Sequence, residues 1–333
     1  MFRWALGALA LLSAAVGCSP GKRSADELTF AGATLRIIVG SAPGGTHDLH
    51  ARLVASHLGR HLPGLPKVIV ENMPGAGGAL ASNYLTTVAP PDGLAIGLLN
   101  ETSAPDVADG RLLDRLALLG SPSASPPVIV FSKRSGITNM DDWRRATRPP
   151  RIGSSGPRAV TFVVPRLGST ILGLPAQIVS GYTGTSEIRL ALESGEVDGI
   201  CVSADAIAPL FGAPDMVNLV LRFGTTSIPG GGGVDALTLA ADDHARRLLE
   251  TGVYEMAALN RVFAVRRDVP EPTLGLLRNA LWTTWSDASF LADAGVAGLT
   301  IAPVGATEVE RQVRKVSEST ELLTELRGIL RAE

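Results

Sequence analysis

The chain has 333 residues, of which 45% are hydrophobic, 19% charged and 5% aromatic, and its formal net charge is −2. At about 150 residues per domain this length favours two domains, and the hydrophobic share is sufficient for a packed core. The lack of a basic excess and the few aromatic residues argue against a nucleic-acid partner.

The N-terminus has the pattern of an export signal in residues 1–17. Arg3 supplies a positive charge before an apolar run from Trp4 to Val16. At about 1.5 Å per residue this run reaches about 20 Å, too short for a bilayer core of about 30 Å. Small residues then lead to Cys18, so the segment resembles a bacterial lipoprotein signal, with cleavage before Cys18 and a lipid on its thiol. An ordinary cleaved signal with a chance cysteine is the alternative, and residues 18–34 are expected to form the anchor and a polar tether.

The rest of the chain contains no run of 18 apolar residues. We therefore expect no pore in this chain, and transport would need separate membrane subunits. Cys201 stands in an apolar run and is expected in the core. With Cys18 acylated, no disulfide within one chain is possible.

Short β-branched runs alternate with helical patterns from residue 35 onward, which predicts an α/β fold with a largely parallel sheet. The first part of the chain is expected to contain strands at 35–40, 67–71 and 94–98 and helices at 46–61 and 77–88.

The middle of the chain repeats this alternation, and the last third is mostly helical. Further strands are expected at 127–132, 151–156, 176–180, 197–202, 218–223 and 260–266, with helices at 139–146, 185–194 and 307–331. We expect two lobes, one formed by 35–132 together with 260–333 and the other by 133–259. The chain would cross between them near 131–134 and return near 259–265, and a ligand would lie in the cleft between the lobes.

Two glycine-rich loops each follow a predicted strand and precede a predicted helix, at Ala42–Asp48 and Asn72–Gly78. Glycine permits positive φ and close approach to the backbone amides. A helix N-terminus adds free N–H groups and a partial positive charge, and ligands bind beyond the carboxyl ends of parallel strands. The pair of loops therefore predicts an anion site built from the backbone. Taken singly, each loop is equally well interpreted as a helix-start turn without a ligand.

The residues of these loops carry a family resemblance. The run from Ile37 to Asp48 (IIVGSAPGGTHD), then Val70–Gly78 (VENMPGAGG), then Ala89–Gly93 (APPDG), resembles the Bug-type substrate-binding receptors of tripartite tricarboxylate transporters. Similar motifs follow at Gly181–Gly184 and Leu192–Gly199. The resemblance covers about 35–210, and the C-terminal region is similar only in layout. The sequence departs from the family pattern at His47, at Thr183, where a basic residue is common, and over 225–237.

The resemblance implies a two-lobed, periplasmic-binding-protein-like fold of type II that binds a small carboxylate, largely through backbone amides. It implies a periplasmic receptor, here anchored to a bacterial membrane through Cys18, that serves two integral-membrane transporter subunits and is itself a monomer. The implied ligand-binding residues of the first lobe are Pro43, Gly44, Gly45, Thr46, Asp48, Gly75, Ala76, Gly77, Gly78, Glu101 and Thr102. Those of the second lobe are Ser154, Ser155, Gly156, Tyr182, Thr183, Gly184, Ser203 and Asp205.

Asp48 has two interpretations. Close to a helix start, its carboxylate can stabilise free N–H groups, a contribution of about 0.3–1 kcal/mol. Alternatively, it could hydrogen-bond a ligand hydroxyl, amine or water, although it would repel a bare carboxylate. The structural role is favoured.

Four of the five histidines, His47, His50, His57 and His61, fall within one arc of a single predicted helix. This spacing could indicate a metal site. No cysteine or acidic cluster accompanies them, and a polar flank beside the apolar face of the helix explains them as well. We expect neither a metal nor a cofactor.

Sequence patterns of enzymes are incomplete in this chain. The glycines from Gly75 onward lack the third glycine of a dinucleotide fingerprint, and no Gly-x-Ser-x-Gly motif occurs. We therefore expect a receptor and no catalytic residues. The alternatives are a hydrolase or transferase that uses Ser154 or Tyr182 in the same cleft, and a ligand-sensing lipoprotein.

Overall fold

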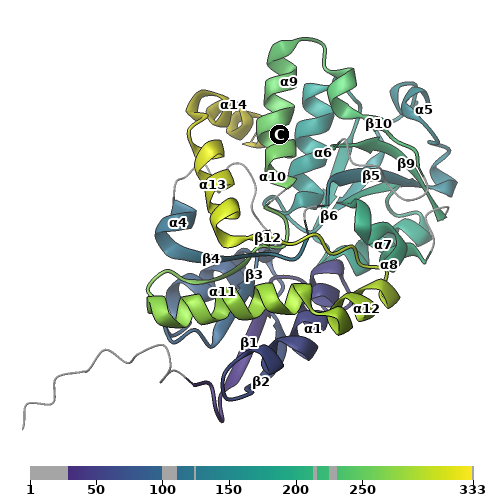
Figure 1. The fold of residues 1–333 in the computed structure, drawn as a ribbon. Helices are drawn as coiled ribbons and strands as arrows, with labels where there is room; N and C mark the ends of the chain where they lie inside the picture. Colours follow the sequence, from purple (N-terminus) through teal and green to yellow (C-terminus); the bar gives the residue numbers. More distant parts are fainter. Residues whose placement is uncertain are drawn as a thin grey trace, which may run out of the picture.

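The computed structural model describes residues 29–99, 111–123, 125–212, 216–224, 231–257 and 259–331, which form two six-stranded sheets flanked by helices (Figure 1). The predicted signal peptide, Cys18, Glu101 and Thr102 lie outside the described residues. The fold is the two-lobed α/β arrangement that the sequence predicts.

The first sheet has the strand order β12-β4-β11-β3-β1-β2. Its strands are β1 (Thr34–Val39), β2 (Lys67–Asn72), β3 (Ala95–Leu98), β4 (Leu116–Ser121), β11 (Phe263–Arg266) and β12 (Val304–Gly305). The helices in the same parts of the chain are α1 (Thr46–Leu58), α2 (Ala79–Asn83), α4 (Arg111–Arg115), α11 (Glu271–Ser286), α12 (Ala288–Val296) and α13 (Ala306–Ser317).

The second sheet has the order β10-β9-β5-β8-β6-β7. Its strands are β5 (Pro127–Ser132), β6 (Arg151–Ser154), β7 (Gln177–Ser180), β8 (Gly199–Ser203), β9 (Val217–Arg222) and β10 (Val234–Asp235). The remaining helices are α5 (Met140–Arg144), α6 (Val160–Ile171), α7 (Thr185–Ser194), α8 (Ile207–Phe211), α9 (Asp243–Leu249), α10 (Glu255–Ala257) and α14 (Thr320–Arg331).

Both sheets are mixed, whereas the sequence analysis predicted largely parallel ones. β1 pairs in parallel with β2 and β3, and β6 with β7 and β8. β11 is antiparallel to β3 and β4, and β5 is antiparallel to β8 and β9. β5 and β11 are the strands through which the chain enters each sheet from the other one. They start at the edge where the parallel strands end, so they must run in the opposite direction.

The C-terminal helices extend over both sheets. α13 packs against β4 of the first sheet, whereas α14 packs against α6 and α9, which flank the second (Figure 1). One hydrophobic cluster accordingly joins β4 to the helices of the second sheet, with Leu118, Leu167, Val313 and Leu326 among its buried members. Within residues 260–333, α13 therefore packs on the first lobe and α14 on the second.

Cys201 lies in β8 with no exposed surface, which is the core position that the sequence predicts. Burial raises the pKa of its thiol. Within the part of the chain that the structure describes, no helix has the length and apolar character needed to cross a membrane.

Candidate ligand-binding site

The two glycine loops of the first lobe lie side by side because β1 and β2, which they follow, pair in parallel. Met73 N donates to Val39 O at 2.8 Å. A Cβ placed on Gly40 would lie 2.7 Å from the Cα of Gly78, closer than side chains approach a backbone. Glycine at this position therefore allows the two loops to touch.

The loop from Gly75 to Gly78 holds its backbone in conformations that glycine favours. The φ angles of Gly75, Gly77 and Gly78 are +145°, +67° and +98°, and that of Ala76 is +49°. Positive φ at a residue with a side chain is uncommon and costs conformational energy. Gly45 does not use positive φ, because its φ is −79°. A side chain at Gly45 would instead meet the second lobe.

Asp48 holds the first loop in place. Its buried carboxylate accepts hydrogen bonds from Gly44 N at 2.8 Å, Arg52 Nε at 2.8 Å and Asn72 Nδ2 at 2.9 Å. Burial raises the pKa of Asp48, but the hydrogen bonds from Arg52, Gly44 and Asn72 outweigh it and keep the pKa below the ordinary value. Since Asn72 ends β2, Asp48 ties the first glycine loop to the start of the second. These partners support its structural role.

Loops of the second lobe contact these two loops directly. A Cβ on Gly156, whose φ is +143°, would lie 2.8 Å from Gly77 N. Ala42 N donates to Thr183 O at 3.2 Å, and a Cβ on Gly45 would lie 3.1 Å from Thr185 Oγ1. The structure thus brings together residues from four loops singled out in the sequence, at 42–46, 75–78, 154–156 and 182–184.

Ser154 and Tyr182, the candidate nucleophiles of the enzyme alternative, have partners within their own lobe. Gly156 N donates to Ser154 Oγ at 3.1 Å, and the Tyr182 hydroxyl donates to Glu196 Oε1 at 2.6 Å. Burial and the carboxylate of Glu196 raise the pKa of Tyr182 to about 12. At neutral pH the phenol is therefore protonated and its proton is directed to Glu196.

A buried cluster of charged and polar side chains joins the lobes where the chain crosses between them. Arg261 has no exposed surface, and its Nη1 and Nη2 each donate to one oxygen of Asp205 at 3.0 Å. Arg261 Nη1 also donates to Ser123 Oγ at 2.8 Å. Asp205 follows β8 of the second sheet, and Arg261 precedes β11 of the first. This ion pair therefore links the two lobes.

Two predicted site residues, Ser203 and Asp205, belong to this cluster. Asn260 Nδ2 donates to Ser203 Oγ at 2.6 Å, and Ser121 Oγ donates to Asn260 O at 2.8 Å. The sequence predicts one strand over 260–266, but β11 begins at Phe263 because Arg261 has a φ of +58°. No sequence motif marks Asn260 or Arg261. They reach the site only because the chain returns from the second lobe to the first at this point.

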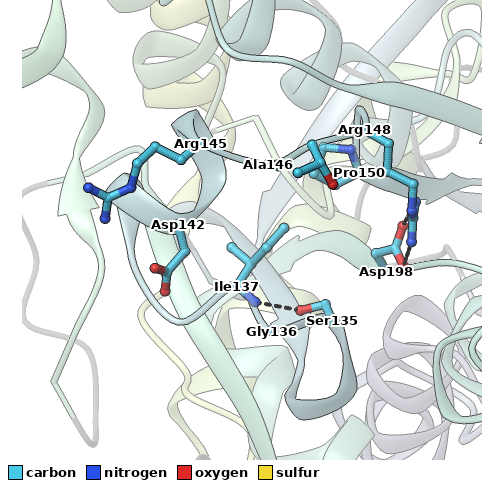
Figure 2. A pocket seen from close by; sticks show the side chains of 10 residues that line it. Ser135, Gly136, Ile137, Asp142, Arg145, Ala146, Arg148, Pro150 and Asp198 are labelled. Carbon is cyan, nitrogen blue, oxygen red and sulfur yellow. Dashed lines mark hydrogen bonds and ion pairs between the residues drawn. The ribbon is translucent and has the colours of Figure 1, made fainter.

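A separate hollow of about 320 Å³ lies at the other end of the second lobe (Figure 2). It is lined by Ser135, Gly136, Ile137, Asp142, Arg145, Ala146, Thr147, Arg148, Pro150 and Asp198. Asp198 accepts two hydrogen bonds from Arg148, at 2.8 and 2.9 Å, so its charge is already neutralised. No residue of the glycine loops lines this hollow.

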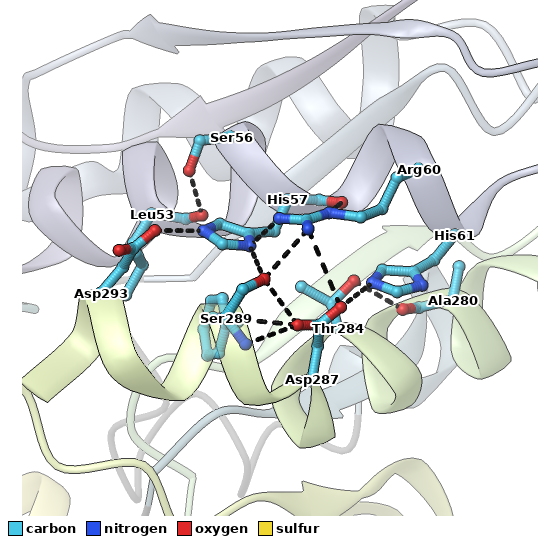
Figure 3. Close-up of polar contacts among 11 residues, drawn as sticks. Leu53, Ser56, His57, Arg60, His61, Ala280, Thr284, Asp287, Ser289 and Asp293 are labelled. Atoms are coloured by element: carbon cyan, nitrogen blue, oxygen red, sulfur yellow. Dashed lines mark hydrogen bonds and ion pairs between the residues drawn. The ribbon is translucent and has the colours of Figure 1, made fainter.

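Two of the four histidines that the sequence places on one arc, His57 and His61, face α12 and make separate contacts there (Figure 3). His57 Nε2 lies 2.9 Å from Asp293 Oδ2, and His61 Nε2 lies 3.0 Å from Asp287 Oδ2. His50 instead contacts Thr46 O through Nδ1 at 2.8 Å. Among the described residues, no three histidine, cysteine or acidic side chains gather in a group that could hold a metal ion.

Sequence comparison finds relatives of modest similarity. No protein-family model matches the chain. A UPF0065 protein of Bordetella pertussis is 30% identical over 189 residues, which is 53% of this chain and 56% of that protein. A UPF0065 protein in the gbd 5′ region of Cupriavidus necator is 37% identical over 84 residues, 25% of this chain and 24% of that protein. The chain thus spans about half the length of the first relative and a quarter of the second.

Structure comparison gives wider coverage at lower identity. The periplasmic binding protein BugD has a TM-score of 0.68 at 18% identity, over 89% of this chain and 97% of that one. MatC from Rhodopseudomonas palustris, with bound malate, has a TM-score of 0.67 at 18% identity, over 87% and 98%. An R. palustris protein with adipate has a TM-score of 0.68 at 17% identity, over 89% and 97%.

The chain therefore has the two-lobed fold of the periplasmic solute-binding proteins. Within that class, the predicted resemblance to the Bug-type receptors is confirmed at the level of the fold, through the similarity to BugD and MatC.

Proposed function

We propose that this protein is an extracytoplasmic solute-binding receptor that captures a small organic acid in the cleft between its lobes and delivers it to a tripartite tricarboxylate-type transporter. The observation that carries the proposal is the meeting of the 75–78 and 154–156 loops, where Gly156 lies against Gly77 N. Two glycine loops at the ends of parallel strands offer backbone N–H groups to an anion, and the second lobe closes over them.

A receptor of this kind needs no catalytic side chain. Ser154 and Tyr182 direct their hydroxyls to partners within the second lobe, which does not favour the enzyme alternative. We expect the captured acid to be recovered chemically unchanged. Malate and adipate, held by the two R. palustris proteins, set the chemical range in which a ligand search should begin.

Replacing Gly77 with valine tests the site. The φ of +67° disfavours valine, and its side chain would stand where the two lobes meet. Three or four charge-assisted hydrogen bonds, at about 1.5–3 kcal/mol each, can support micromolar affinity, so their disruption should weaken carboxylate binding at least about tenfold. Isothermal titration calorimetry with a panel of carboxylates measures this loss.

Gly173→Val is the matched control, because Gly173 has a similar φ of +63° and a Cβ there would meet no atom within 4 Å. It carries the same backbone strain at a distance from the cleft. A folded Gly77→Val protein that binds its acid as tightly as wild type and Gly173→Val would contradict the proposed site.

We also propose that the mature protein begins at Cys18, carries lipid there and is held at the periplasmic face of a bacterial membrane as a monomer beside two integral-membrane subunits. The support is the short apolar run that ends in small residues and cysteine. Each buried CH₂ of an acyl chain contributes about 0.8 kcal/mol, so several chains anchor the protein firmly. Cys18→Ser should move it from the membrane fraction to the soluble fraction. Retention of the variant after a high-salt wash would contradict the anchor.

A further inference from the structure

The buried cluster at the lobe crossing contains polar atoms that no described residue satisfies. Arg261 Nε, His47 Nε2 and His50 Nε2 are all buried and have no hydrogen-bond partner among the described residues. Arg261 is fully buried and His50 is 1% exposed. A buried polar atom without a partner costs about 1–3 kcal/mol. Three such atoms around one ion pair indicate that something else completes the hydrogen bonding here.

The hydrogen bond from His50 to Thr46 determines which nitrogen of its ring can accept a hydrogen bond. Its Nδ1 lies 2.8 Å from Thr46 O, and a carbonyl oxygen only accepts, so Nδ1 carries the proton. Burial, together with the charge of Arg261, lowers the pKa of His50 to about 3, so the ring is neutral at pH 7. Nε2 is therefore an acceptor, and it lies 4.0 Å from another acceptor, Asp205 Oδ2. A group that donates a hydrogen bond is needed between or beside them.

The cluster as a whole carries no net charge. The positive charge of Arg261 is balanced by the negative charge of Asp205, whose carboxylate accepts hydrogen bonds from both Nη atoms of Arg261. His47 is neutral as well, because burial and the charge of Arg261 lower its pKa to about 3. What remains is one donor, Arg261 Nε, one acceptor, His50 Nε2, and the unpartnered Nε2 of His47. A second carboxylate placed here would meet acceptors and a cation that Asp205 has already neutralised.

We propose that the side chains of His50, His47 and Arg261 form a second ligand subsite that takes a neutral hydroxyl group, so that the preferred ligand is a hydroxy monocarboxylate rather than a dicarboxylate. This inference rests on the proposed function, in which the glycine loops hold the carboxylate. A hydroxyl donates one hydrogen bond to His50 Nε2 and accepts one from Arg261 Nε. His47 and His50 are the second and fifth residues of α1, which follows the 42–46 loop, so both subsites share one helix start.

Matched sets of acids test the subsite on the unaltered protein. Each set contains an ω-hydroxy acid, its unsubstituted acid and the dicarboxylate of the same length: 3-hydroxypropionate, propionate and malonate; 4-hydroxybutyrate, butyrate and succinate; 6-hydroxyhexanoate, hexanoate and adipate. In at least one set the hydroxy acid should bind at least about tenfold more tightly than both companions, because a site built for a hydroxyl leaves polar groups unpaired without it.

Variants at His50 then test whether the preference for the hydroxy acid arises at this subsite. His50→Asn can keep a donor to Thr46 O but removes the Nε2 acceptor, and it should abolish the tenfold preference of the hydroxy acid over the unsubstituted acid. His50→Gln places an amide oxygen near the Nε2 position and should recover part of the preference. His61→Asn, a histidine replacement on the α12 side of the same segment, is the matched control and should keep the preference in full.

The outcomes separate this inference from the proposed function. If in every set the dicarboxylate or the unsubstituted acid binds as tightly as the hydroxy acid, the hydroxyl subsite is overturned while the receptor function stands. Unchanged preference in His50→Asn also overturns it. Failure of all nine acids to bind, to wild type and to Gly77→Val alike, overturns both.

Discussion

Single residues at the lobe crossing make stability depend on pH. His50 is neutral in the folded protein because burial and Arg261 lower its pKa to about 3. In the unfolded chain a histidine has a pKa of about 6.5. Between these two values the unfolded state binds a proton that the folded state does not. Stability from this residue is therefore complete above about pH 6.5 and decreases as the pH falls toward 3.

We expect the free energy of unfolding to decrease from pH 7 to pH 5 by up to about 2 kcal/mol through His50 alone. Urea unfolding followed by tryptophan fluorescence at pH 7, 6 and 5 measures this dependence. His50→Asn should have a shallower dependence than wild type. The carboxylates titrate in both proteins, so the difference between the two slopes isolates His50, and identical slopes would contradict the expectation.

The pKa of Asp205 is lowered, whereas burial alone would raise the pKa of an unpaired carboxylate. Burial raises its pKa, but the charge of Arg261 and the hydrogen bonds from Arg261 and Ser125 lower it below the ordinary value. The stability it contributes is present above the unfolded pKa of about 3.9 and is lost as the pH falls through its folded pKa. Acid therefore weakens the lobe crossing through both His50 and Asp205.

At the level of elements, periodicity and turn residues predicted most of the fold. The helix at 185–194 and the strand at 127–132 have the predicted bounds, and the first helix differs only in ending as a 3₁₀ turn at Gly59–His61. β4 was missed because its residues are all buried and follow α4 without a turn signal. α6 was missed because Pro165 and Gly168 interrupt its helical pattern. Tertiary packing of α6 against β8 overrides both.

The candidate site could be predicted where backbone chemistry defines it. Glycines at strand ends are visible in a sequence, and the structure places the 42–46 and 75–78 loops together. Arg261 could not be predicted, because its importance depends on Asp205, 56 residues away in the chain. Such a pair follows no local spacing. It arises only when the returning chain passes the end of β8.

The last helix, α14, is expected to stabilise the second lobe through its buried leucines. Leu326 has no exposed surface, and a Cβ on Gly252 would lie 2.9 Å from Leu326 Cδ2. Leu326→Ala leaves a cavity and should lower the free energy of unfolding by about 2–5 kcal/mol, measured by urea denaturation. Leu291→Ala is the control, because Leu291 is 43% exposed in α12. An equal loss in the two variants would contradict this role of α14.

At the scale of the whole molecule, binding is expected to require movement of the two lobes. The lobes touch at Gly77 and Gly156, yet a ligand must enter between them, so an open form has to exist. Small-angle X-ray scattering should show a smaller radius of gyration when the bound acid is present. Gly77→Val should show no such compaction at the same acid concentration. A radius that stays constant while calorimetry detects binding would contradict hinge closure.

The path of the C-terminal helices also has a consequence for how the protein is made. β11 enters the middle of the first sheet, and α14 covers α6 beside the second, although both come late in the chain. During synthesis from the N-terminus, the first sheet lacks β11 and the second lacks its cover until nearly every residue has left the ribosome. Neither half can reach its final packing early. We therefore expect the nascent chain to stay accessible to chaperones until β11 and α14 have been made.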